Sequence, residues 1–276
     1  MTDFSIITCI SNADVYDRCL LRSINKMRDS YDVEIIPIIN NDNRYSASNA
    51  LNIGIDVANS DILIFVHQDV SLLDDWFSIL SNTIDLLPEN WGVLGSAGIS
   101  MEFTRYDIGN WGGALKADTV AVGTVYESDK SLDNAPYWDG EKNITQVHCV
   151  DECLMVLNKK TGLKFDPMFS GFHFYGMDMC LQARAAGYTI WGSHLPIIHY
   201  GKYSASFSGD KKYWAYMRFL HRKWHMRFPE LLGTHMHWAK DELTSYIPIT
   251  LNANDGSSIT LKSMGLSNVK LAMDEL

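Results

Sequence analysis

The sequence lacks any run near the roughly 18 consecutive apolar residues that a membrane-spanning helix needs, so we expect no transmembrane segment. No basic segment and no separate apolar segment precede the first apolar run, Phe4–Ile10, so we also expect no secretory signal peptide. The five cysteines are odd in number and contain no C-x-x-C pair, which argues against a disulfide framework or a zinc knuckle. Reduced thiols fit a cytoplasmic protein, which is the predicted location.

Positive charge is also scarce. Over 276 residues, 23 Lys and Arg stand against 33 Asp and Glu, which gives a net charge of −10. This balance disfavours sequence-independent nucleic-acid binding, which needs clustered cations against the phosphates, although it leaves room for a local basic patch. With 46% hydrophobic and 20% charged residues, the composition is that of a globular protein rather than a disordered chain.

About the first hundred residues alternate strand-like and helix-like patterns. Continuous apolar strands separated by helices predict a parallel sheet that is covered on both faces. We therefore predict an α/β fold with a Rossmann-like, mostly parallel central sheet. There is no G-x-G-x-x-G after the first strand and no Walker A motif, which argues against a dinucleotide-binding fold or a P-loop NTPase. The predicted strands are Phe4–Ile10, Val33–Ile39 and Ile62–Val66, and the predicted helices are residues 14–28 and 46–58.

The rest of the chain is less regular. Residues 101–145 are rich in Gly, Asp, Asn and aromatic residues, and we expect a loop-rich excursion there that covers the substrate. We predict one domain over residues 1–205, and a C-terminal helical extension and tail over 206–276 that packs on it. Further predicted elements are a strand over 91–98, a strand over 147–157 interrupted by Asp151 and Glu152, and helices over 178–186 and 211–228.

Polar residues follow each of the three N-terminal strands. In parallel α/β sheets ligands bind at the carboxyl ends of the strands, so these residues mark the expected site. They are Ser11 and Asn12 after the first strand, Asn40 to Asn43 after the second, and His67, Gln68 and Asp69 after the third.

The third strand is followed directly by a His-x-Asp pattern formed by His67 and Asp69. An imidazole and a carboxylate two residues apart at a strand end can both reach one divalent cation such as Mn²⁺. The alternative is an ordinary polar turn in which Asp69 caps the following helix. Spacing alone leaves both interpretations open.

Two later segments carry further candidates. Aromatic residues surround His173 and Asp178 just before a predicted helix, where an Asp is either a helix cap or a desolvated carboxylate that serves as a base. A short strand ends in His199, a pattern that by itself is more often structural than functional.

Taken in order, these segments resemble the family 2 glycosyltransferases of the GT-A fold, in particular a bacterial and viral branch with F-V-H-Q-D-V in place of D-x-D. The resemblance runs over roughly residues 4–205. The stretches that carry it are Ala50 to Ile55, Phe65 to Val70, Gly171 to Gly187 and Pro196 to His199. The third includes most of the helix pattern D-x-C-L-x-A-R-x-x-G-Y, which runs from Asp178 to Tyr188.

The resemblance implies a nucleotide-sugar donor and a divalent metal, Mn²⁺ or Mg²⁺. Asp69 matches the metal-binding Asp of D-x-D, His67 stands where the first Asp would be, and His199 matches the C-terminal His that completes the metal site. The expected donor-binding residues are Ser11, Asn12, Asn40, Asp42, Asn49, His67 and Gln68, and the expected acceptor-side residues are Trp111, His173 and Tyr175.

The general base is open between Asp178, Asp151 and Glu152. The family's acidic motif is often Glu-Asp-x-Asp, and here Tyr175 to Asp178 retains only its last acid, with Gly176 in place of another. Leu51 also replaces an Arg that often precedes the Asn in this family, which removes a contact to the nucleobase.

The leading functional prediction is a metal-dependent, inverting transferase. It would move a hexose or deoxyhexose from a UDP- or dTDP-sugar to a hydroxyl of a glycan or lipid-linked acceptor. Cations on the helix over 211–228 also leave open a peripheral contact with a membrane. One alternative is a nucleotidyltransferase, which should carry a Gly-rich basic loop where this chain has Ser11 to Asp14. The other is a non-catalytic glycan-binding protein on the same fold.

Overall fold

The protein is described here by a computed structural model. It describes residues 2–27, 31–73, 75–100, 121–127, 136, 138–200, 211–224, 227, 249–252 and 258–261. Trp111, predicted on the acceptor side, lies outside the described residues.

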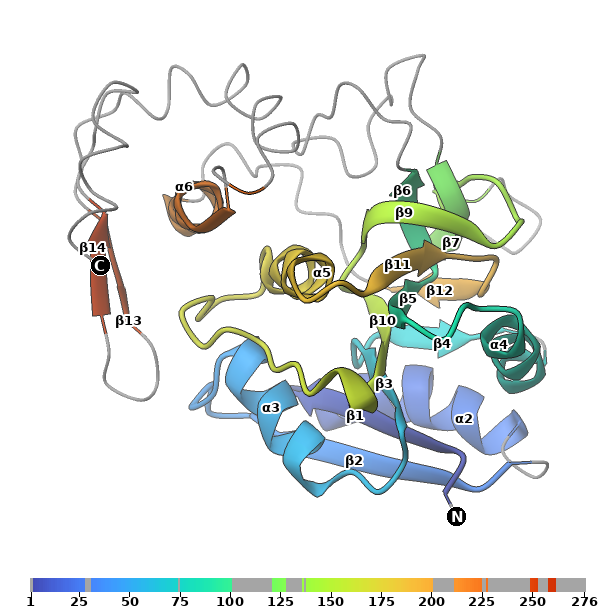
Figure 1. Cartoon of the computed structure of the whole chain (residues 1–276). Helices are drawn as coiled ribbons and strands as arrows, with labels where there is room; N and C mark the ends of the chain where they lie inside the picture. Colours follow the sequence, from blue (N-terminus) through green and yellow to red (C-terminus); the bar gives the residue numbers. More distant parts are fainter. Residues whose placement is uncertain are drawn as a thin grey trace.

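The three N-terminal strands form where the apolar runs predict them. They are β1 (Phe4–Ile10), β2 (Val33–Ile39) and β3 (Ile62–Val66), and β1 lies between the other two and parallel to both. The carboxyl ends of all three strands therefore meet at one edge of the sheet. The strands themselves lie in the lower part of the molecule in Figure 1.

The predicted helices beside these strands are also present. The segment over 14–28 is built from α1 (Ala13–Tyr16), a π-helical stretch (Asp17–Leu21) and α2 (Arg22–Met27). Helix α3 (Ala47–Val57) begins after Ser46, whose hydroxyl accepts the Asn49 N–H at 3.2 Å. A Cβ at Gly54 would clash with Ile7 of β1, so this glycine allows α3 to pack closely on the sheet.

Beyond β3 the sheet is mixed, which corrects the prediction that it is mostly parallel. Its strand order is β2-β1-β3-β10-β5-β11-β9-β6-β7-β12-β4, with β8 paired to β7, and antiparallel pairs predominate after β3. Connections such as the single residue between β5 and β6 are too short for a helical crossover. The elements are β4 (Val70–Leu72), α4 (Trp76–Asp85), β5 (Trp91–Gly95), β6 (Ala97–Ser100), β7 (Ala121–Glu127), β8 (Trp138–Asp139), β9 (Thr145–Val150), β10 (Leu154–Asn158), a 3₁₀ turn (Lys159–Thr161), α5 (Tyr175–Ala185), β11 (Thr189–Gly192), β12 (Ile197–His199) and α6 (Lys211–Trp224).

Several element boundaries differ from prediction. The predicted strand over 91–98 is two strands, β5 and β6, and the predicted loop over 101–145 contains β7 and β8 among its described residues. Helix α5 begins at Tyr175, three residues before the predicted start, with Phe174 as its N-cap. Asp178 therefore lies inside the helix, and the interpretation of Asp178 as a helix cap is wrong.

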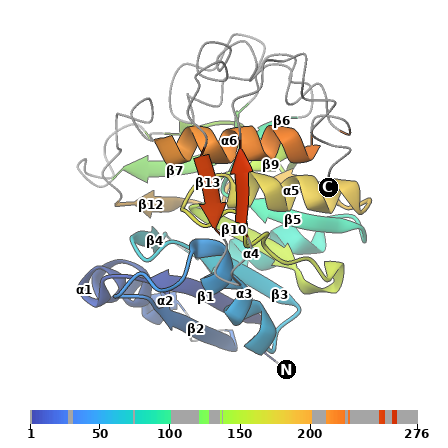
Figure 2. The same cartoon turned by 90° about the vertical axis from the view of Figure 1, so that its left-hand side faces the viewer.

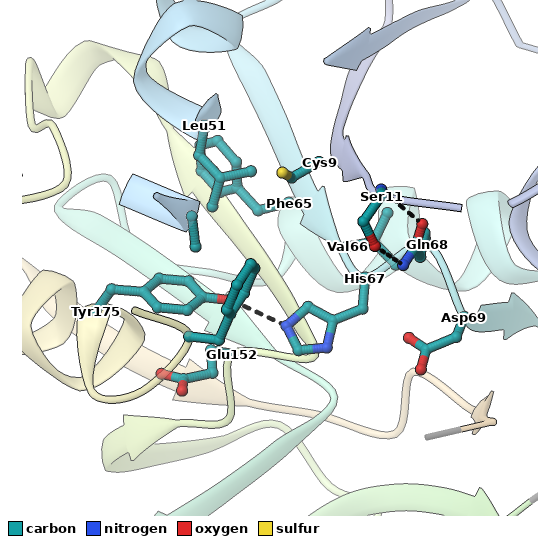
Figure 3. Close-up of a pocket in the computed structure, with 12 residues that line it drawn as sticks. Cys9, Ser11, Leu51, Phe65, Val66, His67, Gln68, Asp69, Glu152 and Tyr175 are labelled. Atoms are coloured by element: carbon teal, nitrogen blue, oxygen red, sulfur yellow. Dashed lines mark hydrogen bonds between the residues drawn. The ribbon is translucent and has the colours of Figure 1, made fainter. Parts of the chain in front are cut away.

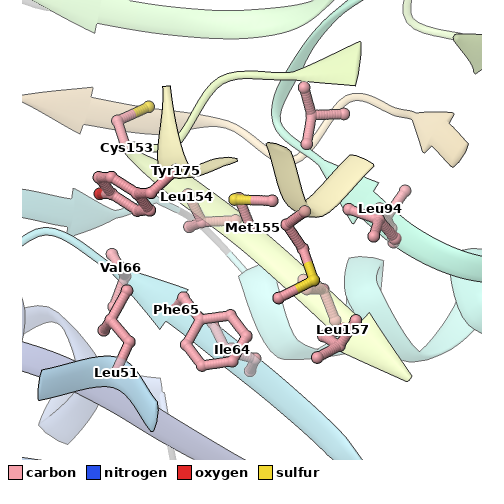
Figure 4. Packing of buried hydrophobic residues seen from close by; sticks show 14 of the residues in the cluster. Leu51, Ile64, Phe65, Val66, Leu94, Cys153, Leu154, Met155, Leu157 and Tyr175 are labelled. Atoms are coloured by element: carbon pink, nitrogen blue, oxygen red, sulfur yellow. The ribbon is translucent and has the colours of Figure 1, made fainter. Parts of the chain in front are cut away.

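The core lies between the sheet and the helices that cover it. Leu51 of α3 packs near Ile64 and Phe65 of β3, while Met155 of β10 and Tyr175 of α5 close the other side (Figure 4). All five side chains are at most about one-twentieth exposed. Burial of such side chains, at roughly 1.5–3 kcal/mol each, is the main stabilising contribution to this edge of the sheet.

Helix α6 packs beside α5, as two views at right angles show (Figure 1; Figure 2). Tyr216 and Leu220 of α6 are buried in the core, and the Tyr216 hydroxyl lies 2.8 Å from Ser170 Oγ. The C-terminal segment also contains a two-stranded hairpin, β13 (Ile249–Asn252) and β14 (Ser258–Leu261), where only helix and tail were predicted. Both strands contain the β-branched pair Ile-Thr, which favours strand there. Within the described residues, no helix has the length and apolar character needed to cross a bilayer.

Candidate metal and donor site

Three strand ends bring His67, Asp69 and His199 together. His67 follows β3, and its backbone N–H donates to the Cys153 carbonyl at 3.0 Å. Asp69 directly precedes β4, which pairs antiparallel with β12 so that His199 lies opposite Val70. The Tyr200 N–H extends this ladder by donating to the Asp69 carbonyl at 2.7 Å. The antiparallel pairing of β4 and β12 thus places His199 beside Asp69, despite their separation in sequence.

The side chains of this triad converge on one point. One ligand atom from each residue lies within 4.8 Å of the others, and His199 Nε2 is 3.5 Å from Asp69 Oδ1. The side chains of His199 and Asp69 are 32% and 25% exposed, so the point is partly open. Two imidazoles and one carboxylate fit a divalent transition metal and leave coordination positions for other oxygen ligands. The donor set therefore fits Mn²⁺.

The electrostatics of the triad favour the metal-binding protonation states. Burial, followed by the neighbouring His199, lowers the pKa of His67, so its ring is neutral at pH 7. Burial alone would raise the pKa of Asp69, but the hydrogen bond from His199 and the two imidazoles outweigh it and lower that pKa. A neutral His and an ionised Asp are the forms that ligate a metal.

Tyr175 holds the His67 ring in place. The Tyr175 hydroxyl lies 2.9 Å from His67 Nε2, and the other ring nitrogen lies on the Asp69 side (Figure 3). Such an outer hydrogen bond fixes the orientation of a metal-binding imidazole. Tyr175 was predicted on the acceptor side; its side chain is buried, lines the cavity and contacts the triad through His67.

Gln68 ties the first and third strand ends together. Its Oε1 accepts the N–H groups of Ser11 at 3.0 Å and Asn12 at 2.9 Å, and its Nε2 donates to Ser11 Oγ at 2.8 Å (Figure 3). These three predicted donor-binding residues therefore meet in the structure. Their contacts with one another make the edge of the site rigid.

A cavity of about 260 Å³ opens beside the triad. Six of its lining residues were singled out from the sequence, namely Ser11, His67, Gln68, Asp69, Glu152 and Tyr175. Six others were not predicted as site residues: Cys9, Ala47, Leu51, Phe65, Val66 and Phe172. Most of these belong to core-like apolar runs. The sequence signals for them were the aromatic run around Phe172 and the place of Leu51, where the family often has an Arg. The cavity thus combines apolar walls with polar residues of the candidate metal triad, His67 and Asp69.

Other predicted site residues have local contacts instead. Asn12 Oδ1 caps α1 by accepting the Val15 N–H, and Asn49 contacts the Ser46 hydroxyl at the start of α3. Asn40 is buried and closes a turn by bonding both backbone polar groups of Tyr45. Asp42 forms an exposed ion pair with Arg44 at 3.2 Å. None of these four lines the cavity, and neither does His173, which adjoins Phe172.

Glu152 lies in the turn between β9 and β10, and its carboxylate points to the first turn of α5. Its Oε2 accepts the Gly176 N–H at 3.1 Å. Burial, and then the charge of Asp151, raises the pKa of Glu152 to about 8. The neighbouring Asp151 has a structural contact, because its Oδ1 accepts the Cys153 N–H at 2.9 Å. Of the three candidate bases, Glu152 is the one that lines the cavity.

Gly176 makes room for Glu152. A Cβ at position 176 would lie 2.8 Å from Glu152 Cβ and 3.0 Å from both Glu152 Oε2 and Met155 Sδ. We therefore expect Gly176→Ala to destabilise the protein by about 1–3 kcal/mol. At an unhindered helix position the same change stabilises by roughly 1 kcal/mol, so the sign of the change in urea unfolding free energy is diagnostic. A more stable Gly176→Ala variant would show that this contact is absent.

Asp178 is enclosed by other partners. Its side chain is fully buried, and it accepts hydrogen bonds from Lys223 Nζ at 3.0 Å, Trp224 Nε1 at 2.7 Å and Gln182 Nε2 at 2.8 Å. Lys223 also contacts Asp166 Oδ2 at 2.7 Å. Burial raises the pKa of Asp178, while Lys223 and Trp224 oppose that shift. The arrangement anchors α6 to α5 and does not bring Asp178 to the cavity.

We therefore expect Asp178→Asn to lower the free energy of unfolding by roughly 3 kcal/mol, since it leaves Lys223 short of a buried counter-ion. Asp166→Asn is the matched control, and a smaller loss is expected because Asp166 is partly exposed. If Asp178→Asn left the free energy of unfolding unchanged but greatly lowered kcat, Asp178 would instead be identified as the base.

The chain matches one protein-family model and is similar in sequence to a curated protein. The model of a glycosyltransferase-like family matches residues 5–217, which is most of the chain. The product named ATP synthase subunits region ORF 6 of Fuscovulum blasticum is 27% identical over 143 residues, 51% of each chain. The chain thus spans about half the length of this curated relative.

Two solved structures are similar in fold at low sequence identity. GalNAc-T7, crystallised with UDP, GalNAc and Mn²⁺, matches with a TM-score of 0.56 at 9% identity, over 90% of this chain and 52% of that one. The mannosyltransferase PcManGT of Pyrobaculum calidifontis, in complex with GDP-Man and Mn²⁺, matches with a TM-score of 0.50 at 11% identity, over 86% and 69%. Both similarities confirm the predicted GT-A fold class.

Proposed function

Since the chain belongs to the glycosyltransferase-like family, we propose that it transfers a sugar from a nucleotide-sugar donor to an acceptor hydroxyl, with a divalent metal and inversion at the anomeric carbon. The observation that carries this proposal is the convergence of His67, Asp69 and His199 beside a cavity at the strand ends. UDP and GDP-Man accompany Mn²⁺ in the two similar structures, which supports a nucleotide-sugar donor here.

The triad is proposed to hold the metal. His67 is already oriented by Tyr175, and the partly open position of Asp69 and His199 leaves room for diphosphate oxygens. A bound Mn²⁺ or Mg²⁺ would supply charge stabilisation for the departing diphosphate. The apolar walls formed by Leu51, Phe65 and Val66 would exclude water, which matters because hydrolysis of the donor competes with transfer.

Glu152 is proposed as the general base. The acceptor oxygen would form a bond to the anomeric carbon as the bond to the diphosphate breaks, and the hydroxyl proton would pass to a Glu152 oxygen. A carboxylate with a pKa of about 8 is a stronger base than an ordinary one, provided it is ionised. Asp151 and Asp178 remain weaker candidates because their carboxylates have the structural contacts described above.

Gly176 bears on the alternative of a non-catalytic glycan-binding protein. The family's acid missing at this position favours that alternative slightly, but the Glu152 carboxylate lies against Gly176 and accepts its N–H. The acid has a substitute from a neighbouring element, so the substitution at Gly176 does not argue against catalysis. No feature of the described residues favours the nucleotidyltransferase alternative.

The acceptor side of the proposal rests on Phe172, which is 50% exposed at the cavity. An exposed aromatic ring beside a polar site suits a glycan or lipid-linked acceptor that has one apolar face. The following experiment identifies the acceptor, the nucleobase of the donor and the transferred sugar, which is a hexose or a deoxyhexose.

The test is turnover of a panel of UDP-, dTDP- and GDP-sugars with Mn²⁺, measured as the release of nucleoside diphosphate. We expect one donor to be consumed, and proton NMR of the first product to show the anomeric configuration opposite to that of the donor. Retention of configuration would overturn the inverting mechanism. No consumption of any donor, with or without a mixed glycan acceptor, would count against the transferase itself.

A further inference from the structure

A second and larger cavity, of about 560 Å³, lies outside the proposed donor site. One wall is the segment of α1, the π-helical stretch and α2, and the other is formed by β4 and the end of β12. Its size falls within the range of small-molecule sites, which is about 300–1,000 Å³. The residues that carry the argument are Arg18, Arg22, Lys26, Ser71, Ile198 and Tyr200.

This cavity backs onto the metal triad through the paired strands β4 and β12. Ile198 pairs with Ser71, and His199 pairs with Val70. Side chains alternate between the two faces of a strand, so Ile198 and Tyr200 face the cavity while His199 faces the triad. The wall is rigid, because Ser71 Oγ donates to the Cys19 carbonyl at 3.1 Å and the Leu72 N–H donates to Ser23 Oγ at 3.1 Å.

The cavity carries concentrated positive charge in an acidic protein. Arg18, Arg22 and Lys26 recur at four-residue spacing on one helical segment, and all three side chains are exposed. Among the described residues Asp75 is the one acidic group in the lining, and no ion pair to any of the three cations is found there. Arg18 Nε donates to the Asp14 carbonyl at 3.1 Å, which fixes its stem along the helix.

The π-helical stretch Asp17–Leu21 places the first of these cations. Short π-helical segments inside α-helices occur frequently at functional sites. Here the segment contains Arg18 and directly precedes Arg22, and both residues line the cavity. Two guanidinium groups and an ammonium around a polar cavity match the charge and hydrogen-bonding geometry of a phosphate group.

We propose that this cavity binds the phosphate group of a second ligand, separate from the donor diphosphate. The proposal goes beyond the transferase function and does not depend on it. The phosphate can belong to a free phosphorylated compound or to the headgroup of an anionic phospholipid, since the chemistry recognised is the same. Because the wall is shared with Asp69 and His199, the bound phosphate would lie behind the metal site without competing for it.

The test is direct binding of two probes to the full chain in the presence of a chelator, which prevents phosphate from binding through a metal at the triad. The first probe is inorganic phosphate, and its binding is measured by titration calorimetry. The second is phosphatidylglycerol vesicles, whose binding is measured by co-sedimentation, with phosphatidylcholine vesicles as the uncharged control. We expect Arg18→Gln/Arg22→Gln to weaken binding of the recognised probe at least tenfold. Arg18→Lys/Arg22→Lys, which keeps the charge but loses the forked guanidinium donors, should bind more tightly than the Gln variant and more weakly than the wild type.

The matched control is Lys160→Gln/Lys164→Gln, which removes two exposed cations from a distant surface. Unchanged binding in this control separates a site from a general charge effect. Loss of phosphate binding in the Arg18/Arg22 variant assigns the site to a free phosphorylated compound, and loss of vesicle binding alone assigns it to a lipid headgroup. No binding of either probe, or equal losses in both double variants, would overturn the proposal. Mn²⁺-dependent donor binding, measured in parallel, should be unchanged in both, so a failed transferase proposal would be recognised separately.

Discussion

Replacing Asp69 by Asn should abolish Mn²⁺-dependent donor binding while leaving the fold intact. Asn keeps the shape of the side chain but removes the charged oxygen that lies 3.5 Å from His199 Nε2. Loss of an outer hydrogen-bond partner already costs roughly 10–100-fold in metal affinity, so loss of a direct ligand should exceed that range. Calorimetric titration of the donor with Mn²⁺ present measures the effect.

The matched control is Asp61→Asn, which alters an exposed carboxylate paired with Lys160 at 3.7 Å. Its donor affinity should equal that of the wild type, and circular dichroism should show that both variants are folded. Donor affinity unchanged in Asp69→Asn would remove Asp69 from the metal site.

Glu152→Gln should lower kcat by roughly 10²–10⁴-fold with little change in donor affinity, because Gln cannot accept the acceptor proton. In the wild type the base acts when ionised, so kcat/KM should rise with pH through the Glu152 pKa of about 8. The Gln variant should lose this rise. A pH–rate profile of both proteins with the best donor measures the effect, and a full rate in Glu152→Gln would move the assignment to Asp151 or Asp178.

The same substitution should stabilise the folded protein at high pH. The folded-state pKa of Glu152 is raised, so between the ordinary carboxyl range and about pH 8 the folded state holds a proton that the unfolded state has lost. Wild-type stability therefore falls as pH rises through this window, whereas Glu152→Gln has no such loss. At pH 9 the variant should be more stable by about 1–3 kcal/mol in urea unfolding, and near pH 4 the difference should vanish. Glu89→Gln, at an exposed carboxylate, is the control and should show no such trend.

The sequence predicted the parts of this structure that depend on local pattern. The three apolar runs became β1, β2 and β3 with the predicted bounds. In β1 and β3 nearly every residue is buried, which leaves few alternatives to a strand covered on both faces, whereas β2 is the half-exposed edge strand. His67 and Asp69 followed from their place at a strand end. The link to His199 came from the resemblance, and its physical cause is the pairing of β12 with β4, which no local pattern specifies.

Local sequence patterns do not predict contacts between elements that are far apart in the sequence. The hydrogen bond of Tyr175 to His67 and the enclosure of Asp178 by Lys223 and Trp224 depend on how α5 and α6 pack. Asn40 was predicted to bind the donor because it is polar and follows a strand, and Asn49 was expected there from the family resemblance. Amide side chains also close turns and helix starts, and that is how the structure uses them.

Thermal unfolding with a panel of nucleotide sugars, with and without Mn²⁺, tests the central claim most directly. A ligand at about 100 times its Kd stabilises a protein by roughly 2.7 kcal/mol, which is readily detected. We expect stabilisation by one donor class only when Mn²⁺ is also present, and we expect the Asp69→Asn variant to lose this stabilisation. Equal stabilisation in a chelator, or none by any nucleotide sugar with Mn²⁺, would contradict the assignment of His67, Asp69 and His199 as a metal site for the donor.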